Sequence, residues 1–345
     1  MIMKNIYNYE KLSMLTMSLA HLLHAGVAVA DALYLLSEDG EETEREILRQ
    51  MAKNADSGMS LASCFDAAGV FPGYLCTLLA VGETVGKTEQ TLKSLAKYYD
   101  GQARLKRQLR SALLYPVVLL IVLLCVLVVL LVWVLPVFDS VYAQLGGSLT
   151  GIAGGLLVLG RYIGRCLPWI GAFLALGCVM VAVPVFRKSA ITLWKKLRGD
   201  RGVWKWVNNA RFIQALALGA VSGMTQPEAV QMASGMANGE IPQFQKRCKS
   251  CENIMEQEEN LADALEKSGF LTIAEGRLLG AGIRSGQGEI ALTQLADRLL
   301  EQSEEKVARL AEKAEPAAVI ISCSLIGLVL VSVMLPLLNI MNTIA

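Results

Sequence analysis

The sequence contains few charged side chains, only two histidines and none of the short motifs that mark common enzymes. Of its 345 residues, 18% are charged and 54% are hydrophobic, which is too apolar for an ordinary soluble protein. The formal net charge of +1 offers no bulk attraction to nucleic acid, so we expect no direct nucleic-acid partner. A phosphate-binding GxxxxGK(S/T) loop and a nucleophile elbow are both missing. We therefore expect no enzymatic activity, no catalytic residue and no cofactor.

Candidate metal ligands are sparse. Cys248 and Cys251 have the C-x-x-C spacing of zinc ligands, but both histidines lie far upstream of them. His21 and His24 stand three residues apart on one face of a predicted helix, and no third ligand accompanies them. The eight cysteines are scattered, and several lie in apolar runs, so they do not form a disulfide framework. We expect reduced thiols and no metal site.

Three uncharged stretches are long enough to span a lipid bilayer, which takes about 20 apolar residues. They are residues 113–135, residues 167–186, and the apolar part of 315–345. Lysines and arginines precede the first and third stretches and follow the second, and such positive flanks stay in the cytoplasm. We therefore expect a multi-pass protein of the cytoplasmic membrane with its N-terminus inside, its C-terminus outside, and an outer loop with an amphipathic helix at 136–166.

The sequence contains an internal duplication. The segment LAHLLHAGVAVADAL at 19–33 matches LALGAVSGMTQPEAV at 216–230 with a shift of 197 residues, and from residue 61 onward the shift is a constant 200. A duplication of this length predicts two structural units of one kind, at 1–112 and 187–314. The shifts align three pairs of glycines: Gly26 with Gly223, Gly82 with Gly282, and Gly86 with Gly286.

The pattern within each unit is helical. Apolar residues recur every three or four positions, and turn residues divide each unit into about six helices. A short helical hairpin around Gly26 or Gly223 needs a helix stop or a close approach, which glycine permits, and the segment from Gly82 to Gly86 is expected to form a turn. The last helix of each unit contains no breaker and should continue into the membrane, where prolines recur at the same shift. They are Pro116 and Pro316 near the start of the span, as bend points, and Pro136 and Pro336 near its end. The predicted fold is all-α, with two six-helix cytoplasmic bundles and three transmembrane helices.

These residues resemble the inner-membrane platform proteins of type II secretion systems, type IV pili and related DNA-uptake pseudopili. In the first copy the resemblance rests on LLHAGVAVADAL at 22–33, FPG and AVGETVGKTEQTLKSLAKYY within 71–99, SALLYP at 111–116 and VLPVF at 134–138. In the second copy it rests on ARFIQALALGAVSGM at 210–224, LLGAGIRSGQGEIALTQLADRLLE at 278–301, AEPAAVI at 314–320 and MLPLL at 334–338.

The resemblance implies a scaffold that couples a hexameric cytoplasmic ATPase to the polymerisation of pilin-like or pseudopilin subunits. Other inner-membrane assembly proteins and further copies of the chain are implied as partners. The resemblance does not distinguish secretion, pilus assembly and DNA uptake. A transporter or channel and a signalling adaptor are the alternatives, although uncharged spans offer no polar path and the short outer loop offers no sensing domain.

Two features leave alternatives open. Glu83 lies in a glycine-flanked turn, where it could cap a helix, form an interdomain ion pair or bind a cation, and the second copy has Ile283 at this position. An acidic stretch is either a docking surface for a basic partner or the solvated start of a helix. It consists of Glu38, Asp39, Glu41, Glu42, Glu44 and Glu46.

Overall fold

The computed structural model describes residues 7–134, 136–137, 140, 144, 158, 202–236, 241–257 and 260–344. Helices are the only regular elements in these ranges, which confirms the prediction of an all-α protein. The chain divides into two compact units. Unit 1 comprises Met1–Gln108 and Lys195–Lys306, and unit 2 comprises Leu109–Trp194 and Val307–Ala345. The helical regions of both sequence repeats therefore belong to one compact unit.

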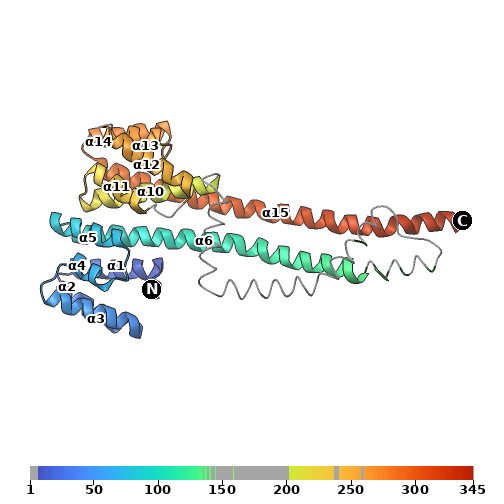
Figure 1. Cartoon of the computed structure of the whole chain (residues 1–345), viewed down its shortest axis with the longest axis horizontal. Coiled ribbons are helices and arrows are strands. Elements are labelled where there is room, and N and C mark those ends of the chain that lie inside the picture. Colours follow the sequence, from blue (N-terminus) through green and yellow to red (C-terminus); the bar gives the residue numbers. More distant parts are fainter. Residues whose placement is uncertain are drawn as a thin grey trace. The chain divides into compact units, whose positions relative to one another are not determined.

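The described helices form two series in the same order. The first consists of α1 (Tyr9–His24), α2 (Val29–Glu38), α3 (Glu42–Asp56), α4 (Leu61–Ala68), α5 (Gly73–Val85) and α6 (Thr88–Val129). The second consists of α10 (Val203–Ser222), α11 (Gln226–Met236), α12 (Pro242–Glu256), α13 (Leu261–Lys267), α14 (Ile273–Arg284) and α15 (Gly288–Ile344). Figure 1 shows α1–α5 gathered near the beginning of α6, and α10–α14 near the beginning of α15.

The two series keep the spacing of the sequence duplication. The helices α2 and α11 begin 197 residues apart, whereas α3 and α12, α4 and α13, α5 and α14, and α6 and α15 each begin 200 residues apart. The three-residue adjustment thus falls between the second and third helices of the repeat. That the two bundles superpose on one another stays a prediction.

The last helix of each series is long, as the absence of breakers predicts. The helix α6 has 42 residues and is followed by a π-helical segment, η2 (Leu130–Val134), directly before Leu135 and Pro136. The helix α15 has 57 residues and continues through Pro316 and Pro336. The helix α6 likewise continues through Pro116. A bend at Pro116 or Pro316 stays a prediction.

The predicted membrane segments are only partly described. Among the residues that the structure describes, no helix combines enough length with enough apolar character to cross a membrane. The three transmembrane helices are therefore not confirmed. The predicted span at 167–186 lies outside the described residues, as does the predicted outer loop at 136–166 except for a few positions.

The first repeat has an aromatic core. The Phe65 ring lies 4.6 Å from that of Phe71, which in turn lies 4.8 Å from that of Tyr7. Tyr74 and Tyr99 also pack together in this repeat, and burial raises the pKa of both phenols far above the ordinary value. These rings bury a large apolar area at one place, which holds α4, α5 and α6 together.

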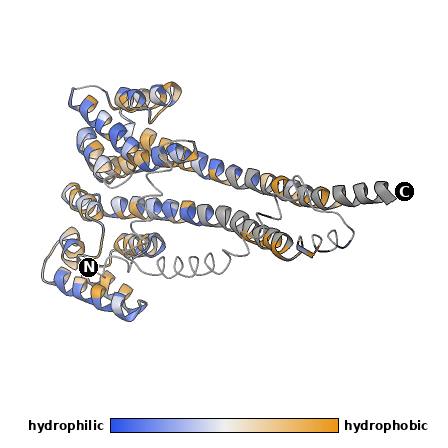
Figure 2. Ribbon diagram, turned by 45° about the vertical axis from the view of Figure 1, so that its right-hand side comes forward, coloured by the Kyte–Doolittle hydropathy of each residue, from blue (hydrophilic) through white to orange (hydrophobic). Residues whose placement is uncertain are grey.

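The second repeat uses a different aromatic cluster. Phe212 of α10 stacks on Phe270 at 4.1 Å between ring centroids, and the Arg247 guanidinium lies 4.4 Å from the centroid of the Phe270 ring. Arg247 also donates hydrogen bonds to the carbonyl oxygens of Ser268 and Gly269 and to Asn209 Oδ1. It therefore satisfies carbonyls at the C-terminal end of α13 while it packs on the core. Figure 2 shows hydrophilic and hydrophobic residues on the same helices of unit 1, as expected where one face of a helix is buried.

In both repeats a glycine lets the fifth helix approach the sixth closely. A Cβ atom added at Gly82 would lie 2.4 Å from Thr91 Oγ1, and one added at Gly282 would lie 2.4 Å from the Cβ of Ala291. Both distances are far below van der Waals contact. The duplicated sequence thus keeps a glycine where the duplicated helix crossing leaves no room for a side chain.

We expect Gly82→Ala and Gly282→Ala each to lower the free energy of unfolding by about 1–3 kcal/mol, because the added methyl group must displace a packed helix. The measurement is chemical denaturation of the full-length protein in detergent. Gly235 of α11 is the matched control, since a Cβ atom there would meet nothing within 4 Å. Gly235→Ala should leave the stability unchanged or raise it slightly. Equal midpoints for all three variants would contradict the close approach.

Candidate functional site

Glu83 lies near the end of α5 and caps another helix. Its Oε1 accepts a hydrogen bond from the backbone N–H of Leu61 at 2.6 Å, and its Oε2 accepts one from Ala62 at 3.1 Å. Both amides belong to the first turn of α4, whose N-cap residue is Ser60. A carboxylate at this position satisfies two amides that have no partner within the helix, and it also complements the helix dipole. The residue therefore connects α5 to α4.

The second repeat starts the corresponding helix differently. Ile283 stands in place of Glu83, and the amide of Ala262 in α13 donates to Asn260 Oδ1 instead. The helix α14 begins with a capping box, in which Thr272 and Glu275 bond each other's backbone amides. The two repeats thus share their helix order and differ in how they cap their helices.

Four of the other predicted turn residues lie at helix ends, whereas Gly82 and Gly282 lie inside α5 and α14 rather than in a turn. Gly26 and Gly223 follow α1 and α10 with φ angles of 80° and 90°. Gly86 and Gly286 follow α5 and α14 with φ angles of 73° and 76°. A left-handed residue lets the chain turn away after the last carbonyls of a helix, and glycine adopts it without steric cost. Each pair therefore ends corresponding helices in the same way.

The acidic stretch surrounds the loop between α2 and α3. Lys11 Nζ lies 3.1 Å from Glu44 Oε2 and 3.3 Å from Glu41 Oε2, and the hydrogen bond to Glu44 raises the pKa of Lys11. Two of the six acidic residues are therefore paired within the protein. The remaining four side chains are exposed: Glu38, Asp39, Glu42 and Glu46.

The candidate metal ligands are placed apart. Cys248 and Cys251 are buried in α12, within the core of the second repeat, and burial raises the pKa of Cys251 to about 12. His24 Nδ1 lies 2.9 Å from Glu89 Oε1, a carboxylate that also accepts a hydrogen bond from Lys93. The described residues contain no group of three or more His, Cys, Asp or Glu side chains that could hold a metal ion.

The two repeats meet within unit 1 at a contact that we call the seam. It joins the first turns of α6 to those of α15, together with α10. Three ion pairs cross it, each with a basic residue on α6 or just before it and an acidic residue on α15. They are Lys87 with Glu289 at 3.1 Å, Lys97 with Asp297 at 2.5 Å, and Arg104 with Glu304 at 3.8 Å.

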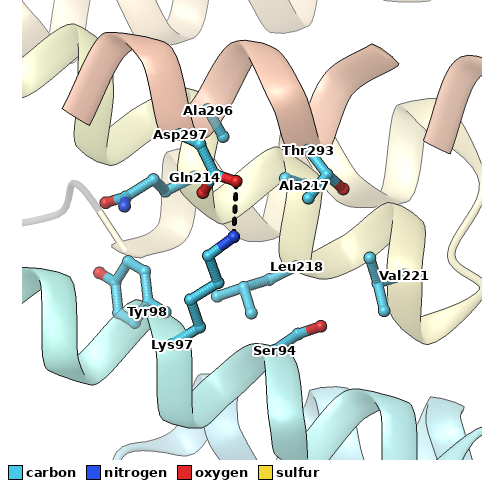
Figure 3. A pocket seen from close by; sticks show the side chains of 10 residues that line it. All are labelled: Ser94, Lys97, Tyr98, Gln214, Ala217, Leu218, Val221, Thr293, Ala296 and Asp297. Carbon is cyan, nitrogen blue, oxygen red and sulfur yellow. Dashed lines mark hydrogen bonds and ion pairs between the residues drawn. The ribbon is translucent and has the colours of Figure 1, made fainter. Parts of the chain in front are cut away.

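The ion pairs surround a buried contact. Gln102 of α6 donates a hydrogen bond to Gln214 of α10 at 3.0 Å, and both side chains are buried. A Cβ atom added at Gly101 would lie 2.8 Å from Leu300 Cδ2, so Leu300 fills the space that the glycine leaves. Figure 3 shows Lys97 reaching from α6 to Asp297 on α15, across a small pocket that Leu218 and Val221 of α10 also line.

The seam was not expected from the sequence, although a signal for it exists. Positions 97 and 297 correspond under the shift of 200, as do positions 104 and 304, and the charge is reversed at both. Reversed charges can pair where two such positions face each other, but they do not show by themselves that they do, since Glu46 and Lys246 are reversed in the same way. What the arrangement does is mechanical: it holds the starts of two long helices together and in register.

Comparison with known proteins gives a consistent result for both halves. The model of the family described as type II secretion system (T2SS), protein F, matches residues 15–136 and again residues 212–336. The type IV pilus assembly protein PilC of Thermus thermophilus is 25% identical over 97% of this chain and 84% of its own length. The type II secretion system protein F of Vibrio cholerae is 24% identical over 96% of this chain and 82% of its own length.

Removal of the Glu83 carboxylate tests the connection between α5 and α4. We expect Glu83→Ala to lower the free energy of unfolding by about 1–2 kcal/mol, because two amides of the first turn of α4 lose their acceptor. Thr84→Ala is the control on the neighbouring residue, whose exposed hydroxyl bonds only the Ala80 carbonyl of its own helix. Thermal unfolding of the full chain is the measurement, and a melting temperature equal to that of the control would refute the capping role.

Proposed function

Because the chain belongs to the type II secretion system protein F family, we propose that it is a membrane platform of a type II secretion or type IV pilus-like assembly machine. It binds a hexameric cytoplasmic ATPase and couples it to the polymerisation of pilin-like or pseudopilin subunits. The observation that carries this proposal is that one family model matches both repeats, over most of the chain. A scaffold fits the site geometry, since the seam holds the starts of α6 and α15 together.

We place the platform in the cytoplasmic membrane. This part of the proposal is supported by the uncharged stretches of the sequence and by the basic residues on one side of each. The charged faces of unit 1 then lie in the cytoplasm, where an ATPase can reach them. The long helices α6 and α15 begin in this unit and continue towards the apolar stretches.

The exposed acidic residues of the first repeat are the proposed contact with the ATPase. Glu42 and Glu46 stand four residues apart on α3, and Glu38 and Asp39 end α2 and begin the following loop. These four carboxylates are exposed, whereas Glu41 and Glu44 are held by Lys11. The four exposed carboxylates outnumber the exposed Arg45 and Arg49 of α3, and an excess of negative charge attracts a basic partner surface and raises the rate of encounter.

A charge reversal tests both the function and this contact. A strain without the chain should form no pili or pseudopili, and the parental gene should restore them. We expect Glu42→Lys with Glu46→Lys to reduce the ATPase that co-purifies with the protein by about tenfold, because attraction becomes repulsion. The control is Glu256→Lys with Asp263→Lys, two exposed acidic residues of the second repeat.

The two claims fail separately in this experiment. Normal pilus output in the deletion strain would refute the platform function. Loss of output in the deletion strain, with equal ATPase binding by both double variants, would refute only the acidic contact. Protein levels in the membrane fraction must match for the comparison to count.

Reporter fusions test the proposed sidedness. A reporter at Asn5 or Gly239 should show the cytoplasmic phenotype, and one at Gly147 or at the C-terminus should show the outer one, because positive flanks stay inside. An alkaline phosphatase and green fluorescent protein pair at each position is the measurement. A cytoplasmic signal at Gly147 would overturn the topology.

A further inference from the structure

The seam joins two similar but not identical faces. We call the first-repeat side, on α6, the first face, and the second-repeat side, on α15 and α10, the second face. Positions 97 and 104 of the first face lie opposite positions 297 and 304 of the second. Because these positions correspond in the duplication, the contact resembles a two-fold interface in which each position meets its own counterpart. Two like faces could therefore in principle meet in the same geometry.

Charge opposes the pairing of like faces. Two first faces would bring Lys97 against a second Lys97 and Arg104 against a second Arg104. Two second faces would bring Asp297 and Glu304 against their own copies. The outer pair of Lys87 and Glu289 does not distinguish a second face from a first face. Glu89 occupies the position of Glu289 in the first repeat, so Lys87 could pair with it equally well. Like charges held face to face exclude the wrong partner even where the correct ion pair is partly exposed.

Shape opposes the same pairings. Leu300 fits against Gly101, where a Cβ atom would already lie within 2.8 Å of it. If two second faces met, Glu301 would take the place that Gly101 has in the seam. Its side chain would then clash with Leu300 of the other face, because even a Cβ atom has no room there. If two first faces met, Asp100 would take the place that Leu300 has in the seam. The space beside Gly101 would then contain a carboxylate and no apolar side chain.

The buried hydrogen bond adds a third restriction. Gln102 donates to Gln214 inside the seam. The residue that corresponds to Gln214 in the first repeat is Met17, by the shift of 197. Between two first faces, the buried amide of Gln102 would therefore meet a thioether and lose its partner, which is unfavourable.

We propose that the seam is a recognition surface that accepts only the opposite repeat. Its first face binds a second face, normally of the same chain, and rejects another first face. A second copy of this chain can consequently associate through the seam only by exchanging repeats, so that each first face binds the second face of the other copy. Contacts between chains that keep their own seams closed must use other surfaces.

Two complementary variants of the full-length chain test this. The first carries Lys97→Asp and Arg104→Glu, and the second carries Asp297→Lys and Glu304→Arg, so each places like charges across its own seam. When the two are co-expressed, opposite charges meet only between chains. They meet there between like faces as well as between opposite faces, so a preference for opposite faces must come from the fit of Leu300 against Gly101 and from the hydrogen bond of Gln102 with Gln214. A carbodiimide that joins amines to carboxylates directly can report the contacts, because the Lys97 and Asp297 side chains are 58% and 39% exposed.

In the parental protein, mass spectrometry of a mixture of normal and 15N-labelled chains should find the 97–297 crosslink within single chains. In the co-expressed variants, we expect crosslinks from position 97 of one chain to position 297 of the other. They should exceed crosslinks between two positions 97 or two positions 297 by about tenfold or more. A single chain with all four substitutions should regain the crosslink within one chain, which controls for misfolding.

Three results would overturn the proposal. The first is a co-expressed pair whose crosslinks join like positions as often as opposite ones. The second is a co-expressed pair without crosslinks between chains. The third is a fourfold variant that fails to restore the crosslink within one chain although it is folded.

Discussion

The close approach of α6 and α15 at Gly101 and Leu300 is the contact on which the organisation of unit 1 depends. Each repeat has its own aromatic core, and Leu218 of α10 is buried within the core of the first repeat. Both repeats belong to one compact unit, and at the seam a glycine on one long helix receives a leucine from the other. The tight fit buries Gln102 and Gln214, whose amides must then bond each other. The ion pairs lie around this buried centre, where partial exposure limits each to a small contribution to stability.

The duplication explains why the seam can exist and also why it is asymmetric. Two copies of one helical unit have the same outline, so they can pack about an approximate two-fold axis. After duplication, each copy could change residues independently, as Glu83 and Ile283 show within the bundles. The reversed charges at positions 97 and 297, and at 104 and 304, are divergence of the same kind. Here the changed residues lie in the contact between the repeats, where they favour pairing of the first face with the second.

The helices and their ends were largely predictable because they depend on local chemistry. Gly26 and Gly223 stop helices by adopting a left-handed backbone, a property of the residue that needs no knowledge of its neighbours. The length of α15 follows in the same way from the absence of a breaker between Glu289 and Ala314. The π-helical segment η2 was not expected, since no side-chain pattern distinguishes it from an α-helix.

The contacts between distant residues were not predictable from local patterns. That Glu83 would cap α4 rather than form an ion pair or bind a cation depends on where α4 begins, some 21–22 residues earlier in the chain. The fit of Gly101 against Leu300 depends on a helix crossing that periodicity does not encode. The reversed charges at Lys97 and Asp297 were present in the sequence, but they acquire meaning only when the two helices are known to face each other.

The seam also bears on how a platform could pass motion along the chain. The helices α6 and α15 both begin at the seam and extend about 60 Å and 85 Å at 1.5 Å per residue. Because a helix without proline is stiff, a displacement at the first turns of α6 or α15 is carried along its axis as far as the predicted bend points Pro116 and Pro316. If the two helices were free to slide, a partner bound to the first repeat would move α6 alone. The fitted contact at Gly101 prevents such sliding, since a shift by one turn would set Leu300 against the bulky Lys97 or Leu105. A force applied to either repeat is therefore shared by both helices.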